Sequence, residues 1–150
     1  PCNNNKAARI HSVPEQYRPQ FDSDITEIRM LMGYQHHLFQ SDQLEQFFTT
    51  EYTISPQSDR MGYRLEGTAI PHSNKQMLSE GICLGAVQLP ADGQPIILLC
   101  DRQTIGGYPK LGSVFSQDIA KLAQLMPGRK IQFKPMDLKQ AQILLRQNKQ

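Results

Sequence analysis

Hydrophobic and polar residues alternate over Thr26–Met32, which is the pattern of a half-buried β-strand. We expect further short strands over these segments: Glu51–Ser55, Gly62–Glu66, Gly81–Leu89, Pro95–Cys100 and Arg129–Phe133. Because Pro95–Cys100 is apolar throughout, we expect it to be covered on both faces. The sequence Pro90-Ala91-Asp92-Gly93 lies between two of these strands, and Asp-Gly flanked by apolar runs predicts a hairpin.

Helical spacing of apolar residues appears in only three short segments. The first segment begins at Ser41 and Asp42, which can cap a helix. The second covers Gln117–Leu125, and the third covers Asp137–Leu145. A doubly wound α/β sheet needs helices that alternate with strands, and that rhythm is missing. The pattern therefore predicts a mainly β protein, a closed or nearly closed barrel with two or three short helices.

The first residues differ in character from the rest of the chain. Residues 1–23 carry polar clusters and two prolines, Pro14 and Pro19, without a sustained hydrophobic period. We expect residues 1–23 to be a linker or an extended arm, and residues 24–150 to form one domain. The chain opens on Pro1 and not on methionine, which suggests a fragment of a longer subunit.

Charge and composition exclude several classes of partner. Sixteen Lys and Arg against fourteen Asp and Glu leave a formal charge of +2, too even for nucleic acid or an anionic membrane surface. The longest apolar run, Pro95–Cys100, is far shorter than the roughly 20 residues of a membrane helix. Cys83 and Cys100 lie in apolar segments, where we expect buried, reduced thiols and hence a cytoplasmic protein.

The loop that connects Glu51–Ser55 to Gly62–Glu66 concentrates hydroxyl, carboxylate and guanidinium groups. Ser58, Asp59 and Arg60 are candidates for substrate binding, because a guanidinium can clamp a carboxylate in bidentate fashion and Asp59 could orient it. The alternative is an Asx-type turn, in which Asp59 caps backbone amides and Arg60 pairs locally. Residue types alone favour the turn.

A second polar loop, Asp101–Pro109, emerges directly from the most apolar strand. Its adjacent glycines can let backbone amides approach a ligand and form a cup for an anion, or they can serve only as a barrel corner with positive φ. The residues of this loop with candidate roles are Asp101, Gln103, Thr104, Gly106, Gly107 and Tyr108.

Glu80 and Gln88 add a further carboxylate and a further amide to the candidate groups. We expect the polar segments around Arg60, Glu80 and Thr104 to meet at one mouth of the barrel. No metal site is predicted, because the adjacent His36 and His37 would point to opposite faces of an extended chain.

Several blocks in a fixed order resemble the biotin-dependent carboxyltransferase-like family over about residues 26–134. These blocks are Ser58–Gly67, Ser79–Gly81, Gly85–Pro90, Gly93–Leu99 and Asp101–Pro109. The family includes proteins named allophanate hydrolase subunit 2, Kip-type regulators of sporulation kinases, the C-type subunit of 5-oxoprolinase and the carboxyltransferase domain of urea carboxylase. The resemblance implies a cyclophilin-like closed β-barrel that forms the C-terminal half of a longer subunit.

The resemblance also implies a function. In 5-oxoprolinase the C-type subunit works with two other proteins, one of the allophanate hydrolase subunit 1 type and one of the LamB type. The assembled complex uses ATP to open 5-oxo-L-proline to L-glutamate, and no cofactor is expected to bind this chain tightly. Arg60 would then hold the substrate carboxylate, the Gly106-Gly107 amides would stabilise an oxyanion, and Asp101, Glu80 or Tyr108 would manage protons. A site shared between two halves would leave this half inactive alone.

Other interpretations stay open. A Kip-type protein would bind a partner inhibitor of a sensor histidine kinase and catalyse nothing. A urea carboxylase-like system would use the chain as its carboxyltransferase component, with biotin carboxylase and biotinyl segments that this chain does not contain. A prolyl isomerase is the weakest alternative, because the active-site string of true cyclophilins is missing.

Overall fold

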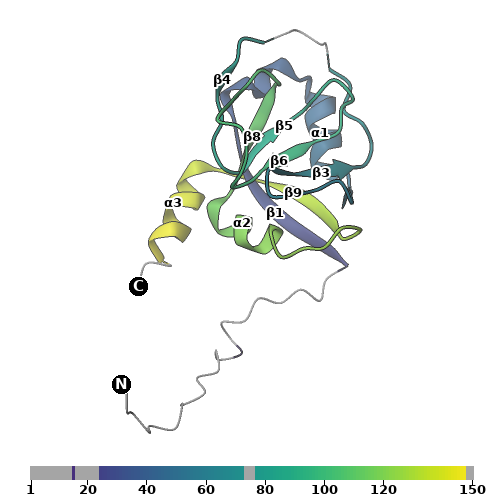
Figure 1. Ribbon diagram of the computed structural model, residues 1–150. Coiled ribbons are helices and arrows are strands. Elements are labelled where there is room, and N and C mark those ends of the chain that lie inside the picture. Colours follow the sequence, from purple (N-terminus) through teal and green to yellow (C-terminus); the bar gives the residue numbers. More distant parts are fainter. Residues whose placement is uncertain (1–14, 16–23, 73–76, 148–150) are drawn as a thin grey trace, which may run out of the picture.

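Seven strands form a closed barrel within the part of the chain that the computed structural model describes, residues 15, 24–72 and 77–147 (Figure 1). Around the barrel the strand order is β1-β8-β5-β6-β3-β2-β9. The barrel strands are β1 (Ile25–Met32), β2 (Tyr52–Ile54), β3 (Gly62–Glu66), β5 (Ala86–Gln88), β6 (Ile96–Leu98), β8 (Lys110–Val114) and β9 (Lys130–Met136). The prediction of a mainly β, closed barrel is confirmed.

Strand β1 connects the beginning of the domain to its last two strands. It pairs in parallel with β9 from Ile25↔Lys130 to Leu31↔Met136, and antiparallel with β8 at its C-terminal end. Ile28 and Met30 alternate inward and are fully buried. The alternation that predicted this strand from sequence therefore also defines which face enters the core.

Two helices insert side chains into the barrel core. Helix α1 (Ser41–Thr49) places Phe47 at 4.6 Å from the ring of Phe133 in a stacked arrangement, and Tyr52 packs beside both. Helix α2 (Ser116–Leu122) contributes Ile119 and Leu122. Helix α3 (Leu138–Gln147) projects beside the barrel (Figure 1). Three helices are predicted from sequence, and all three are present.

The predicted hairpin is confirmed. Strands β5 and β6 pair antiparallel through Val87↔Ile97 and Gln88↔Ile96. In the turn between them Gly93 adopts φ +72° and donates its N–H to Pro90 O over 3.0 Å. Asp-Gly thus supplies the left-handed residue that the turn requires.

Other boundaries differ from the prediction. The expected strand over Gly81–Leu89 is broken into β4 (Glu80–Gly81) and β5, because Gly85 takes φ +80° and turns the chain between them. The loop after β6 contains a short strand, β7 (Ile105–Gly106), which pairs with β4. Sequence patterning also missed a 3-10 turn, η2 (Tyr34–Leu38).

Strand β8 was missed because two of its residues do not look like strand residues. Gly112 and Ser113 interrupt the apolar pattern of this segment. Gly112 is required by close packing, since a methyl group there would lie 2.0 Å from Leu31 O on β1. A glycine that weakens the local strand signal is thus explained only by its neighbour across the sheet.

The predictions for the cysteines and for residues 1–23 have different outcomes. Cys83 and Cys100 are both exposed, so the prediction of buried thiols is wrong; each follows or precedes the apolar strand residues instead of lying among them. The predicted arm over residues 1–23 lies outside the described residues except for Glu15. Among the described helices, none has the length and apolar character needed to cross a bilayer.

Candidate functional site

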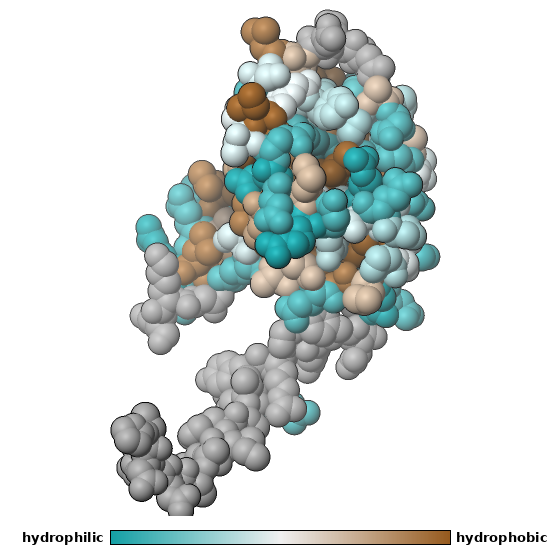
Figure 2. Space-filling model, viewed as in Figure 1, coloured by the Kyte–Doolittle hydropathy of each residue, from teal (hydrophilic) through white to brown (hydrophobic). Residues whose placement is uncertain are grey.

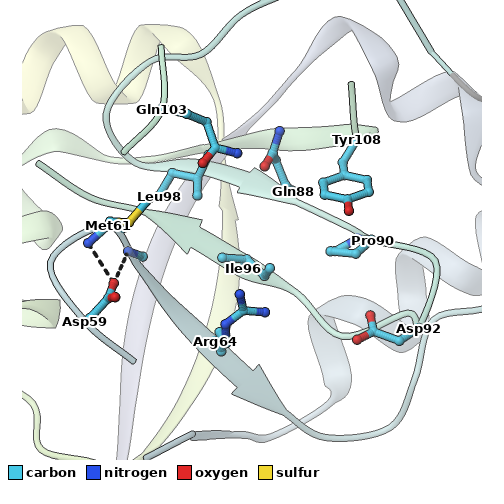
Figure 3. A pocket seen from close by; sticks show the side chains of 11 residues that line it. Asp59, Met61, Arg64, Gln88, Pro90, Asp92, Ile96, Leu98, Gln103 and Tyr108 are labelled. Carbon is cyan, nitrogen blue, oxygen red and sulfur yellow. Dashed lines mark hydrogen bonds between the residues drawn. The ribbon is translucent and has the colours of Figure 1, made fainter. Parts of the chain in front are cut away.

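A row of side chains from three neighbouring strands forms the floor of a cavity on the outer wall of the barrel. Strand β6 lies between β3 and β5, with Ile96 paired to Arg64 on one side and to Gln88 on the other. Alternate residues such as Leu65 and Ile97 belong to the buried core, so Arg64, Ile96 and Gln88 point outward. Figure 3 shows these side chains on one face of the sheet.

The cavity above this row has a volume of about 300 Å³ and mixes polar and apolar groups. Hydrophilic side chains gather over this part of the barrel in Figure 2. The lining residues are Asp59, Met61, Gly62, Arg64, Gln88, Pro90, Asp92, Ile96, Leu98, Gln103 and Tyr108. They come from β3, β5, β6 and the two loops that sequence analysis singled out, so the fold does bring these loops together.

Arg64 supplies the cationic group of the cavity. Its backbone is held firmly, because Ser58 Oγ accepts the N–H of Arg64 over 3.0 Å and donates to its carbonyl over 3.2 Å. Its guanidinium makes no ion pair within 4.0 Å and no hydrogen bond among the described residues. Arg64 is therefore available to an anionic ligand. Sequence analysis did not assign it this role, although the alternation of β3 places residue 64 on the outward face.

Gln88 presents a buried amide that lacks a partner. Only 1% of this residue is exposed, and no described residue lies within hydrogen-bonding distance of Nε2. A methyl group at Gly106 would lie 3.2 Å from Gln88 Nε2 and 3.8 Å from Gln103 Nε2. The bare Cα of Gly106 thus lets two amide nitrogens approach one small region. Leaving a buried donor unpaired costs about 1–3 kcal/mol, which a ligand oxygen would recover.

The two carboxylates of the cavity are already used by turns. Asp59 Oδ1 accepts the N–H groups of Met61 and Gly62 over 2.8 and 3.2 Å, as the dashed lines in Figure 3 show. Asp92 Oδ1 accepts the N–H of Gln94 over 3.0 Å. The interpretation of Asp59 as an Asx-type cap, which the residue types favoured, is confirmed.

Arg60 and Asp101 do not line this cavity. They pair with each other at 2.8 Å between Arg60 Nε and Asp101 Oδ2, and both side chains are well exposed. The backbone N–H of Asp101 also donates to Arg60 O, which joins the two loops. Ser58 and Arg60 instead line a neighbouring cavity of about 430 Å³ with Cys100 and Ile119. The guanidinium that lines the first cavity is therefore that of Arg64 and not that of Arg60, the residue predicted as a carboxylate clamp.

Glu80 belongs to a polar cluster that ties β4 to η2 and β8. Its carboxylate accepts hydrogen bonds from Tyr34 and Gln35 and pairs with Lys110 Nζ at 3.0 Å. The hydrogen bond from Tyr34, together with Lys110, holds the pKa of Glu80 below its usual range, and the same bond raises the pKa of Tyr34. A carboxylate kept ionised in this way is a weak general base.

The remaining candidate residues of the second loop lie in different environments. Gly106 lies in β7, and neither Gly106 nor Gly107 has positive φ, so the barrel-corner explanation is wrong. Thr104 accepts the N–H of Ile82 through its carbonyl. Tyr108, half exposed, does line the cavity.

The segments around Arg60 and Thr104 do meet, through Asp59 and Gln103, but not at a barrel mouth, and Arg60, Glu80 and Thr104 themselves do not line the cavity. The cavity lies on the outer wall, and Asp59, Gln88, Gln103 and Tyr108 are the predicted residues that share it. The two adjacent histidines bond to backbone carbonyls, His36 to Gly33 O and His37 to Tyr34 O. Within the described residues no three His, Cys, Asp or Glu side chains gather as metal ligands.

Fold and cavity together define a β-barrel domain with a cavity of mixed polar and apolar lining on its outer wall. Comparison with known sequences identifies the family of this domain. Residues 1–135 match the family model described as carboxyltransferase domain, subdomain A and B. The chain therefore belongs to the carboxyltransferase domain family.

Named relatives fall into two groups. The chain is 40% identical over 122 residues to the C-type subunit of 5-oxoprolinase from Haemophilus influenzae and 39% identical over 115 residues to that from Escherichia coli. These matches cover 81% and 76% of this chain but only 40% and 37% of the relatives. The crystal structure of the K. lactis urea amidolyase superposes with a TM-score of 0.78 at 27% identity, over 87% of this chain and 9% of that one.

Proposed function

We propose that this chain is the C-terminal, carboxyltransferase-type part of the C-type subunit of a 5-oxoprolinase. In this proposal it acts with a protein of the allophanate hydrolase subunit 1 type and with a LamB-type protein. The complex converts 5-oxo-L-proline to L-glutamate and consumes ATP, which the other two proteins handle. The outer-wall cavity contributes to binding the substrate.

Three observations support this proposal. Family membership and the identity of about two fifths to named C-type subunits of 5-oxoprolinase supply the class of complex. The unpaired guanidinium of Arg64 in the cavity carries the choice of substrate, because 5-oxoproline is a small carboxylate. Four of the five blocks of the family resemblance also contribute residues to the walls of this cavity, and the block Ser79–Gly81 does not.

The chain's own residues would bind and orient the substrate. Arg64 holds the carboxylate, and the apolar side chains of Ile96 and Leu98 support the ring from below. Ring opening requires attack on the lactam carbonyl and a proton for the departing nitrogen. Of the three proton carriers predicted from sequence, Tyr108 alone lines the cavity, and it is our candidate for that contact.

The decisive experiment measures ATP-dependent release of glutamate from 5-oxoproline. The full-length protein is co-expressed with its two partner proteins, and the Arg64→Gln variant is compared with Arg60→Gln. We expect Arg64→Gln to impair the reaction at low substrate and Arg60→Gln to leave it unchanged. Absence of glutamate release by the wild-type complex, together with capture of a kinase inhibitor protein, would support the Kip-type function instead.

The structural likeness to urea amidolyase favours one second candidate, a carboxyltransferase component of a urea carboxylase-like system. Urea is neutral and has no carboxylate for Arg64 to bind. Carboxylation of urea by a complex containing this protein, with urea binding insensitive to Arg64→Gln, would identify that function.

A further inference from the structure

Several side chains of the cavity can donate hydrogen bonds and lack a protein acceptor among the described residues. They include the guanidinium of Arg64, the buried Nε2 of Gln88 and the Nε2 of Gln103. The two amide nitrogens converge beside Gly106, while Arg64 lies on the far side of Ile96. Strands lie about 4.8 Å apart, so the backbones of Arg64 and Gln88 are separated by about 10 Å.

This arrangement is suited to a ligand with two oxygen-bearing ends. An unpaired buried donor is unfavourable, and it is relieved only by an acceptor such as a carbonyl oxygen. Gly106 contributes by its missing side chain, since any larger residue would press on Gln88 Nε2. The cavity floor between the two ends is apolar and formed by Ile96 and Leu98, which suits the hydrocarbon part of a small ring.

We propose that Gln88, assisted by Gln103, determines specificity by donating to a ring carbonyl oxygen of the ligand, while Arg64 receives a carboxylate at the opposite end. The inference rests on the proposed function in assigning this cavity to the substrate. It adds that the cavity distinguishes an oxo-substituted cyclic acid from the same ring without the oxo group. A site built around an unpaired donor rejects a ligand that lacks the acceptor.

Two carboxylates, Asp59 and Asp92, also line the cavity and oppose an anionic ligand. Each is neutralised in part by backbone N–H groups, two for Asp59 and one for Asp92. Their hydrogen bonds direct Oδ1 of each residue into its own turn. A cationic ligand is the opposite expectation, and the experiment includes it.

The test measures binding to the 150-residue chain by two-dimensional NMR titration with three matched ligands. 5-Oxo-L-proline carries both ends, 2-pyrrolidinone lacks the carboxylate, and cyclopentanecarboxylate lacks the oxo group together with the ring nitrogen. We expect the wild-type chain to bind 5-oxoproline at least about tenfold more tightly than either analogue, from the worth of one such hydrogen bond. L-prolinamide, a cation at neutral pH, should bind more weakly.

Variants separate the two ends. Gln88→Met should abolish the preference for 5-oxoproline over cyclopentanecarboxylate and keep the preference over 2-pyrrolidinone, whereas Arg64→Gln should do the reverse. Gln88→Glu is a second variant of similar shape that replaces the donor by a carboxylate, and it should bind 5-oxoproline more weakly than Gln88→Met. Arg60→Gln is the matched control, and the dispersion of each NMR spectrum reports folding.

Several outcomes overturn the inference. They are no binding of 5-oxoproline by the wild-type chain, equal binding of cyclopentanecarboxylate, tighter binding of L-prolinamide, or an unaltered ligand preference in Gln88→Met. The proposed function fails separately. A complex that releases no glutamate, with the ligand preferences intact, contradicts the reaction alone, whereas release that is unaffected by Gln88→Met contradicts only the specificity role.

Discussion

Arg64 and Gln88 flank Ile96 on the outer wall of the barrel, on two strands that do not touch each other. Their positions follow from the register of β6, which pairs Ile96 with Arg64 of β3 and with Gln88 of β5. Twenty-four residues separate them in sequence, yet one row of the sheet presents both to one cavity.

Replacement of Arg64 should weaken substrate binding in the assembled complex. A charge-assisted hydrogen bond is worth about 1.5–3 kcal/mol, so Arg64→Gln should raise the KM for 5-oxoproline about 10- to 150-fold. Steady-state kinetics of glutamate release measure this change. Arg60→Gln is the control, because Arg60 pairs with Asp101 outside the cavity; an equal rise in KM for both variants would count against Arg64.

Gln88→Met should stabilise the folded chain. Burial of a polar group without a partner costs about 1–3 kcal/mol, and methionine fills a similar volume without this cost. We expect the free energy of unfolding to rise by about 1 kcal/mol, seen as a higher midpoint in urea at unchanged slope. A lower midpoint would show that Gln88 stabilises the fold and is not held ready for a ligand.

Gly106→Ala should weaken both ligand binding and the stability of the fold. Its methyl group would lie 2.7 Å from Ile82 Cδ1 and 3.2 Å from Gln88 Nε2, both ends of side chains that can shift. Such overpacking costs about 1–3 kcal/mol and displaces the Gln88 amide.

A matched control for Gly106→Ala lies on the neighbouring strand. Gly81 of β4 pairs with Ile105, and a methyl group there meets nothing within 4 Å. NMR titration with 5-oxoproline and urea unfolding should show wild-type behaviour for Gly81→Ala. Unchanged affinity in Gly106→Ala would disprove the need for glycine beside Gln88.

The ion pair between Arg29 and Asp118 should make a large contribution to stability. Asp118 accepts from Arg29 Nε at 2.8 Å, from the second guanidinium nitrogen at 2.5 Å and from the backbone N–H at 2.9 Å. Their side chains are 36% and 7% exposed, and the pair fastens α2 to β1. Loss of one partner leaves a poorly hydrated charge, so Asp118→Asn should cost about 2–4 kcal/mol.

The control for this ion pair is Glu51→Gln. Lys130 and Glu51 pair at 3.0 Å with side chains 53% and 43% exposed, and an exposed pair of this kind contributes less than about 1 kcal/mol. Chemical unfolding of both variants gives the two values. Similar losses in the two variants would contradict the importance that we assign to burial.

Glu80 should make stability depend on pH in the acid range. Because the bond from Tyr34 lowers the pKa of Glu80 in the folded state below 4.5, its ionised form favours folding. This contribution is complete above about pH 5 and is lost as the pH falls through the folded-state pKa. Urea unfolding at several pH values should therefore show Glu80→Gln less stable than wild type near neutrality and equal to it in strong acid. A difference independent of pH would contradict the assignment.

The sequence identified much of this fold because the relevant signals are local. Alternation over Thr26–Met32, the Asp92-Gly93 turn and the helical spacing after Ser41 each depend on a few adjacent residues, and all three appear in the structure. Strand β8 was not predicted, because the glycine at position 112 is required by its close contact with Leu31 on the neighbouring strand and not by its local sequence. The motif blocks likewise indicated the family from residues that are neighbours in the chain.

The membership of the site was decided by the tertiary structure. Arg60 and Arg64 look equivalent in sequence, but strand pairing directs Arg64 toward the cavity. Arg60 instead pairs with Asp101, 41 positions further along the chain. In the same way, Glu80 forms an ion pair with Lys110 and accepts a hydrogen bond from Gln35, both distant in sequence. A sequence determines by itself what its short segments prefer and which family's motifs it carries. Which side chains share a cavity depends on strand register, which forms only when distant segments pair.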